Sequence, residues 1–158
     1  MSSTFFISGI PKPQPRPRAF ARNGRAHVYN PATAEGWKSC VALCAKPHAP
    51  CEPTAEPVAL EIDFLLPRPK AHYFASGEVK PTAPDLHPKK PDLDNLIKAV
   101  MDAMTELGFW VDDSQVVSVL ASKRYATKGK EGAAIFIGDP SAGEAYQMIH
   151  KWGEGFQQ

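Results

Sequence analysis

The clearest pattern in the chain is an apolar stripe at three- and four-residue steps over residues 93–107. The stripe places seven side chains on one side of a helix: Leu93, Leu96, Ile97, Val100, Met101, Met104 and Leu107. Gly108 follows as the residue that ends the helix, because glycine readily adopts the left-handed conformation found there. The pattern predicts an amphipathic helix with a wide face directed toward a hydrophobic core.

Four other segments are typical of strands, because they alternate between apolar and polar residues or are rich in β-branched and aromatic ones. The predicted strands are 3–10, 57–67, 115–125 and 131–137. In the second of these, one face consists of Val58, Leu60, Ile62 and Phe64. Residues 18–29 carry Asn23-Gly24 between two short segments and predict a β-hairpin.

Two further helices are predicted, one from Pro31 to about Lys46 and one over 141–152. Strands and helices interleave, and some strands form hairpin-like pairs. The predicted fold class is therefore α/β or α+β, a mixed β-sheet with helices packed on it. A chain of 158 residues has the length of one domain, so we expect a single small domain over 1–158.

Proline-rich segments separate these elements. Residues 11–18 contain four prolines, which lack amide donors, so this segment is expected to be extended and exposed. Residues 67–90 form a long loop that is rich in proline, mostly basic and low in pattern. Loops of this length are usually functional or disordered. Because it directly precedes an acidic motif, we favour a loop that contacts the substrate over a plain linker.

The net charge of +1 conceals a separation of charge along the sequence. No acidic residue precedes Glu35, whereas five basic residues do: Lys12, Arg16, Arg18, Arg22 and Arg25. Over 91–114 the only basic residue is Lys98, against Asp92, Asp94, Asp102, Glu106, Asp112 and Asp113. This separation suits a polyanion held by lysine and arginine beside a metal ion held by carboxylates. Scattered solvated charge is the alternative, but it does not explain why the signs separate.

The N-terminal residues lack the basic region of a signal peptide, and no apolar run is long enough to cross a bilayer. Three cysteines make a disulfide framework improbable, so the sequence predicts a protein of the reducing cytoplasm without a membrane partner. Three cysteines and a histidine are spaced C-x3-C-x3-H-x2-C, namely Cys40, Cys44, His48 and Cys51. We favour buried structural thiols over a zinc site, because prolines interrupt the set.

The acidic motif begins with Asp92 and Asp94, directly after Pro91 and at the start of the predicted helix. Residues two apart in a helix point about 200° from each other. Asp92 lies at the corner before the helix, so its side chain can turn to join that of Asp94. An aspartate at an N-cap is also a routine way to start a helix, and this alternative accounts for one of the two.

Asp112 and Asp113 close a turn before the strand at 115–125, so a third carboxylate reaches the pair if that strand lies beside the helix start. Two or three aspartates suffice to hold Mg2+, which activates water in phosphodiester cleavage. Lys98, one turn after Asp94, is placed to stabilise the transition state, and the alternative is an ordinary ion pair within the helix. An EF-hand is excluded, since Ile97 and Ala103 replace its glycine and glutamate.

These residues resemble a known family. DLDNLIKAVMDAM, followed after seven residues by DDSQVVSVLASK, resembles the RusA family of Holliday-junction resolvases, and GIPKPQPRPR is similar to the family's opening. The resemblance implies Mg2+- or Mn2+-dependent endonucleases that act as homodimers on four-way DNA junctions. It further implies that Asp92, Asp94 and Asp113 are the metal ligands, that Lys98 is catalytic and that Lys123 contacts DNA. Asp112 stays open as a neighbouring ligand, and Asp102 and Gln115 are read as supporting residues.

A junction nuclease must hold phosphates, and basic side chains are expected to do so: Arg16, Arg18, Arg22, Arg25, Lys89, Lys90 and Arg124. A junction with two-fold symmetry calls for a two-fold dimer, in which each subunit cuts one strand. The resulting hypothesis is a Mg2+-dependent endodeoxyribonuclease that resolves four-way junctions in recombination and repair. Two alternatives remain: a non-catalytic protein that binds branched DNA, and a metal-dependent nuclease for other branched DNA.

Overall fold

The computed structural model describes residues 2–13, 18–22, 25–29 and 35–141. In chain order the strands are β1 (Ser3–Ser8), β2 (Arg18–Arg22), β3 (Arg25–Tyr29), β4 (Val58–Leu66), β5 (Val116–Tyr125) and β6 (Gly132–Gly138). The helices are α1 (Glu35–Ala45) and α2 (Leu93–Glu106), with short 3-10 turns η2 (Lys46–His48), η3 (Lys70–His72) and η4 (Asp113–Gln115).

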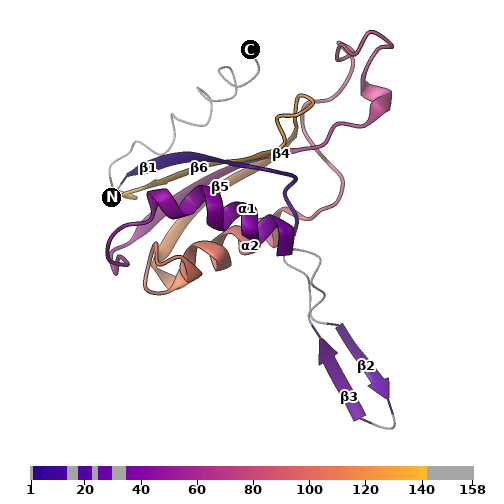
Figure 1. Cartoon of the computed structure of the whole chain (residues 1–158). Helices are drawn as coiled ribbons and strands as arrows, with labels where there is room; N and C mark the ends of the chain where they lie inside the picture. The colour runs from indigo at the N-terminus through magenta and orange to yellow at the C-terminus, as the bar shows by residue number, and fades with distance from the viewer. Residues whose placement is uncertain (1, 14–17, 23–24, 30–34, 142–158) are drawn as a thin grey trace.

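Four strands form one mixed sheet in the order β1-β6-β4-β5. β4 pairs in parallel with β5, whereas the β1–β6 and β6–β4 pairs are antiparallel. Both helices lie on one face of the sheet (Figure 1). The predicted fold class, a mixed sheet with helices packed on it, is confirmed as a small α+β domain.

The core forms between the two helices and the sheet because β4 is buried on both faces. Leu60, Ile62 and Phe64 of β4 are at most 1% exposed and face the apolar stripe predicted for α2. That stripe contributes Leu96 and Val100, which have no exposed surface. Each such side chain contributes ~1.5–3 kcal/mol when buried, so α2 is held firmly against the sheet along its length.

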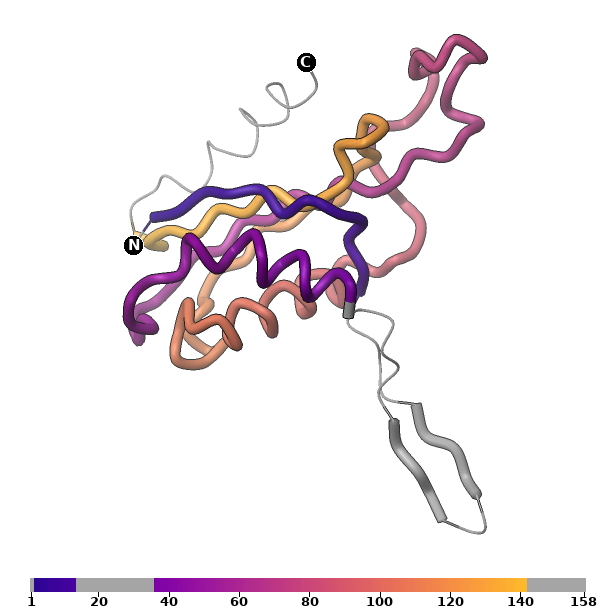
Figure 2. The backbone as a smooth tube through the Cα atoms, viewed as in Figure 1, coloured from indigo at the N-terminus to yellow at the C-terminus, as the bar shows by residue number. Residues whose placement is uncertain are grey.

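The parallel pairing of β4 and β5 decides which segments lie at each end of the sheet. The chain leaves the end of β4, passes through the loop at 67–90 and returns along α2 to the start of β5 (Figure 2). Backbone bonds join Thr54 to Phe109 and Val111 just before β4 and β5 begin. At the other end, Lys123 near the end of β5 bonds Pro91, just before α2. The start of α2 therefore lies beside the end of β5.

Most predicted elements are present in the described residues. The hairpin over 18–29 is confirmed as the antiparallel pair β2–β3. α1 and α2 follow the predicted ranges, although residues 30–34 at the expected start of the first lie outside the described residues, as does the expected helix over 141–152 from residue 142 on. The loop at 67–90 contains η3 and a bridge between Tyr73 and Val79. No helix within the described ranges is long and apolar enough to span a bilayer.

Glu61 stands out on β4 because it is an acidic residue that is only 2% exposed. Neither of its carboxylate oxygens has a hydrogen-bond partner. Burial raises the pKa of the Glu61 carboxyl above its usual value, since the charged form loses its hydration. A residue of this kind costs stability when it is ionised.

We expect Glu61→Gln to raise the melting temperature at pH 7.5. The folded wild type binds a proton more readily than the unfolded chain, so its stability rises as pH falls through the raised pKa, and this gain is complete below 4.5. The advantage of the variant should therefore shrink toward pH 4.5 in melting curves recorded across this range. Glu56→Gln, at an exposed glutamate, is the control. A pH-independent difference between variant and wild type would contradict the expectation.

Candidate active site

Asp92 occupies the N-cap position of α2 without acting as a cap. Its backbone is extended, with φ −72 and ψ 138, and its side chain accepts no hydrogen bond from the first turn. Asp94 lies in that first turn, where a negative charge is favourable, and both aspartates are exposed. The capping alternative is therefore wrong for Asp92. Its carboxylate remains available to a ligand.

Lys98, the predicted catalytic lysine, pairs with Asp102 on the next turn of α2. Its Nζ lies 3.0 Å from the Asp102 carboxylate, and the lysine side chain is 60% exposed. An exposed pair of this kind contributes only ~0.3–0.5 kcal/mol. The ammonium can therefore leave Asp102 for a stronger partner at small cost.

The structure separates the roles of Asp112 and Asp113, which the sequence left open. Asp112 is the N-cap of η4: its Oδ1 accepts from the Ser114 amide at 2.9 Å, and its own amide donates to the Gln115 side chain at 2.6 Å. The bond from Ser114 lowers the pKa of the Asp112 carboxyl. Asp113 is exposed in the turn that follows. Of the two, Asp113 is thus the better candidate ligand.

Asp113 and the Asp92–Asp94 pair lie at opposite ends of α2 within one chain. The segment before η4 is tied to the end of the helix, since the Trp110 indole donates to Thr105 at 2.7 Å. α2 has 14 residues, so about 20 Å separates its ends. In the described ranges, no group of three or more histidine, cysteine or acidic side chains is arranged to hold a metal ion. The expectation that the start of β5 lies beside the helix start is wrong.

Two basic residues at the end of β5 already have partners in the protein. Lys123 Nζ donates to the carbonyl oxygens of Lys89 and Pro91. The Arg124 guanidinium donates to both carboxylate oxygens of Asp63, which also accepts from Ser122 at 2.6 Å. Pairing with Asp63 raises the pKa of Arg124. Whether either residue also contacts DNA stays a prediction.

Other predicted DNA contacts differ in what the structure describes. Lys89 and Lys90 are exposed immediately before the aspartates. Arg18, Arg22 and Arg25 lie in the β2–β3 hairpin, but their side chains, like all of Arg16, lie outside the described part of the chain.

Charge is separated between the two ends of the sheet. Exposed basic residues follow β4 and β5 or precede α2: Lys70, Lys89, Lys90, Lys128 and Lys130. Exposed acidic residues gather where β4 and β5 begin and β6 ends, with Lys46 in the same region: Glu52, Glu56, Asp112, Asp113 and Asp139. The basic end, which also holds Asp92 and Asp94, is the end suited to nucleic acid.

The cysteines do not add to this site. Cys40 and Cys44 are partly buried against the core, as expected of structural thiols, whereas Cys51 is exposed. The His48 ring stacks on Phe5, with 4.7 Å between centroids.

Comparison with known proteins agrees with this arrangement. Residues 8–137 match the family model of the endodeoxyribonuclease RusA. The chain belongs to the RusA family. YqaN of Bacillus subtilis, an uncharacterized protein, is 36% identical over 130 residues, which are 77% of this chain and 87% of the relative.

Two relatives with a named activity are crossover junction endodeoxyribonucleases. The RusA protein of Enterobacteria phage 82 is 31% identical over 128 residues, 80% of this chain and 88% of its own length. That of Escherichia coli K12 is 54% identical over 41 residues, which cover 26% of this chain and 34% of the relative. The expected family membership is confirmed.

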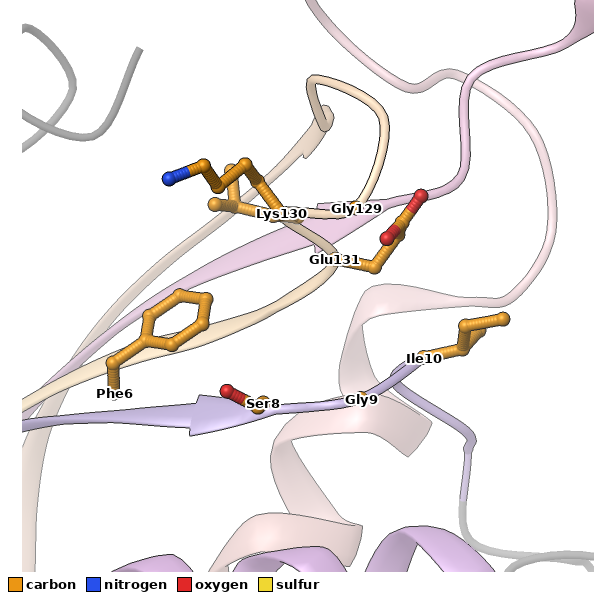
Figure 3. Close-up of a pocket in the computed structure, with 8 residues that line it drawn as sticks. Phe6, Ser8, Gly9, Ile10, Gly129, Lys130 and Glu131 are labelled. Atoms are coloured by element: carbon orange, nitrogen blue, oxygen red, sulfur yellow. The ribbon is translucent and has the colours of Figure 1, made fainter. Parts of the chain in front are cut away.

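In this RusA-family chain, a hollow at the basic end was missed by the sequence reasoning. It measures about 440 Å3 and is lined by Phe6, Ser8, Gly9, Ile10, Leu65, Gly129, Lys130 and Glu131 (Figure 3). Most of these come from the end of β1 and the turn between β5 and β6, segments that are far apart in sequence. None of the predicted site residues lines it. Lys130 and Glu131 carry opposite charges, so the hollow is not a simple anion site.

We expect Asp112→Ala to lower the melting temperature, because it removes the acceptor that caps η4. Asp112→Asn should retain most of the stability, since asparagine caps a helix about as well as aspartate. Asp113→Ala is the matched control: Asp113 makes no capping bond and should be neutral in thermal melts. Equal destabilisation by Asp112→Ala and Asp113→Ala would contradict the separate roles.

Proposed function

We propose that this protein is a Mg2+-dependent endonuclease that cuts four-way DNA junctions as a homodimer, with paired nicks in two opposed strands. Its membership in the RusA family supports the reaction class, as does the junction activity named for its relatives. The observation that carries the proposal for this chain is the Asp92 carboxylate, which stands at a helix start without serving the helix. Cytoplasmic location and a role in recombination and repair belong to the same proposal.

The donor chemistry fits a hard divalent cation. Asp92 and Asp94 offer carboxylate oxygens only, which suit Mg2+, and neither has its carboxylate committed to the helix. Bound there, Mg2+ supplies positive charge against the phosphate and lowers the pKa of the attacking water, and Mn2+ is a possible substitute.

The chain's own residues do the rest of the work. Lys89 and Lys90 are exposed directly before the aspartates and hold the DNA backbone beside them. Lys98, one turn after Asp94, leaves Asp102 and stabilises the charge that develops as the 3′ oxygen departs. These residues lie on α2 or immediately before it, so the same packing that fixes the helix fixes the site.

A third carboxylate must come from a second subunit, because Asp113 lies at the far end of α2 within the same chain. β5 is an edge strand, and Val117, Val119 and Leu120 on it are 41–60% exposed. Only its last residues are covered, by a bridge between Leu86 and Arg124. Apolar side chains on an open edge are suited to pairing with an identical strand.

Antiparallel pairing of two β5 strands completes the site. If the two-fold axis passes near Val119, residue 113 of one subunit lies opposite residue 125 of the other, since the two numbers are equally far from 119. Residue 125 is next to the segment that leads into Asp92. The partner's Asp113 thus approaches Asp92 and Asp94, and an acidic end meets a basic one. Each of the two sites in the dimer would then draw carboxylates from both subunits.

We expect Asp94→Asn to abolish cutting of a synthetic four-way junction while junction binding survives, because the substitution removes a metal ligand without changing the fold. Gel assays of cleavage in Mg2+ and of binding in its absence measure the two properties. Loss of both together would make Asp94 structural. Binding of the wild type without cleavage in Mg2+ or Mn2+ would favour the non-catalytic alternative, and comparison with flaps and other branches tests the third reading.

The shared site predicts that two inactive variants complement each other. Asp94→Asn and Asp113→Asn subunits, co-expressed with different affinity tags and purified as a heterodimer, regain one intact site. We expect this heterodimer to nick one strand of the junction, whereas each homodimer stays inactive. If all ligands of a site come from one chain, both sites of the heterodimer are damaged and no nick appears.

The reciprocal heterodimer is the matched control. It combines the wild type with a subunit carrying both Asp94→Asn and Asp113→Asn. A site shared between subunits leaves neither site intact, so cutting is lost, whereas sites within single chains leave one intact. Opposite results from the two heterodimers separate the arrangements without any assumption about absolute rates.

A further inference from the structure

The ammonium of Lys123 is directed at the protein backbone. Lys123 lies opposite Phe64 in the β4–β5 register, on the face of the sheet that carries α2. Its Nζ donates to the Lys89 carbonyl at 2.5 Å and to the Pro91 carbonyl at 2.7 Å. The side chain is half-buried, and none of the described acidic residues forms an ion pair with it. Two of the three ammonium hydrogens are thereby used within the protein.

The two carbonyls lie immediately before Asp92. The Pro91 carbonyl belongs to the rigid peptide group that joins Pro91 to Asp92, so holding its oxygen fixes the orientation of that group. On the other side, the Leu96 amide donates to the Asp92 carbonyl at 3.2 Å. No capping bond fixes the Asp92 side chain. The direction of the carboxylate therefore follows from this backbone, which Lys123 holds.

His87 reinforces the same attachment. Its amide donates to the Lys123 carbonyl at 3.2 Å, its Nδ1 lies 3.1 Å from the Lys89 carbonyl oxygen, and its buried ring contacts Tyr125 with 4.6 Å between centroids. The Tyr125 amide in turn donates to the Asp85 carbonyl at 2.8 Å. Residues 85–91 are thus tied to the end of β5 by both backbone and side chains. The approach to Asp92 is a fixed support for the site.

We propose that Lys123 is a positioning residue for the metal-binding carboxylate of Asp92, instead of the DNA contact that its basic character predicts. The inference rests on the proposed nuclease function, since it concerns how Asp92 is presented to metal and substrate. Displacement of a reacting group by about 1 Å can cost on the order of 100-fold in rate, so a support outside the site has a large effect on turnover.

Lys123→Met tests the proposal, because methionine keeps much of the length and removes the donors. We expect turnover at saturating junction to fall about tenfold or more. Junction affinity without divalent cations and its dependence on salt should stay close to those of the wild type, because no phosphate contact is lost. Hydrogen exchange on the metal-free protein should show faster exchange of the Leu96 amide, since the start of α2 loses its support.

Lys90→Met is the matched control, since Lys90 is exposed in the same segment. It should weaken binding and lower the slope of log affinity against log salt by about one, as expected when one phosphate contact is lost. If Lys123→Met gives this result, with turnover at saturation and Leu96 exchange unchanged, the proposal is overturned.

Lys123→Arg decides the matter if the methionine variant does not fold. A guanidinium keeps the charge for a phosphate, but its planar fork does not reproduce the bonds of a compact ammonium to these two carbonyls. Positioning predicts lost turnover with retained binding, whereas a DNA contact predicts that both are retained. Absence of cutting by the wild type would refute the nuclease function instead, and the exchange and salt measurements would still report on Lys123.

Discussion

Parallel pairing of β4 with β5 obliges the chain to cross back over the sheet, and α2 is that crossing. A helix packed along its whole length against Leu60, Ile62 and Phe64 cannot shift, so its two ends define two chemically different ends of the domain. Asp92 and Asp94 come to lie beside the end of β5, among exposed lysines. Asp113 comes to lie where β5 begins, among acidic residues. The placement of each candidate ligand follows from the direction of one strand pair.

This constraint explains how far the sequence could be read. Periodicity found the strands and α2, because burial on one face leaves its mark on residue type. Strand direction leaves no such mark, so the sequence did not reveal which end of β5 lies beside the helix start, and the three carboxylates were expected to meet within one chain. The capping box at Asp112 was visible, since aspartate followed three residues later by glutamine is its signature. It distinguishes Asp112 from Asp113 without any structure.

Lys123 and Arg124 show a different limit of sequence reasoning. Basic residues near an acidic motif in a DNA-binding protein resemble phosphate contacts, and composition gives no reason to separate them. The structure directs Lys123 to carbonyls 32 and 34 residues away and Arg124 to Asp63, 61 residues away. Asp63 is only 4% exposed, so without Arg124 a carboxylate would be buried unpaired, which is costly. Long-range partners of this kind depend on the fold and not on local pattern.

The edge of β5 connects stability to assembly. An open edge with exposed valine and leucine is a liability for a monomer, because it can pair with any other strand. Here the segment at 85–87 covers only the last residues of that edge, and the same segment leads to Asp92. A second β5 strand over the remaining residues would cover the apolar side chains and set an acidic end beside a basic one. The feature that makes the isolated subunit incomplete as a sheet is then the one that completes its carboxylate site.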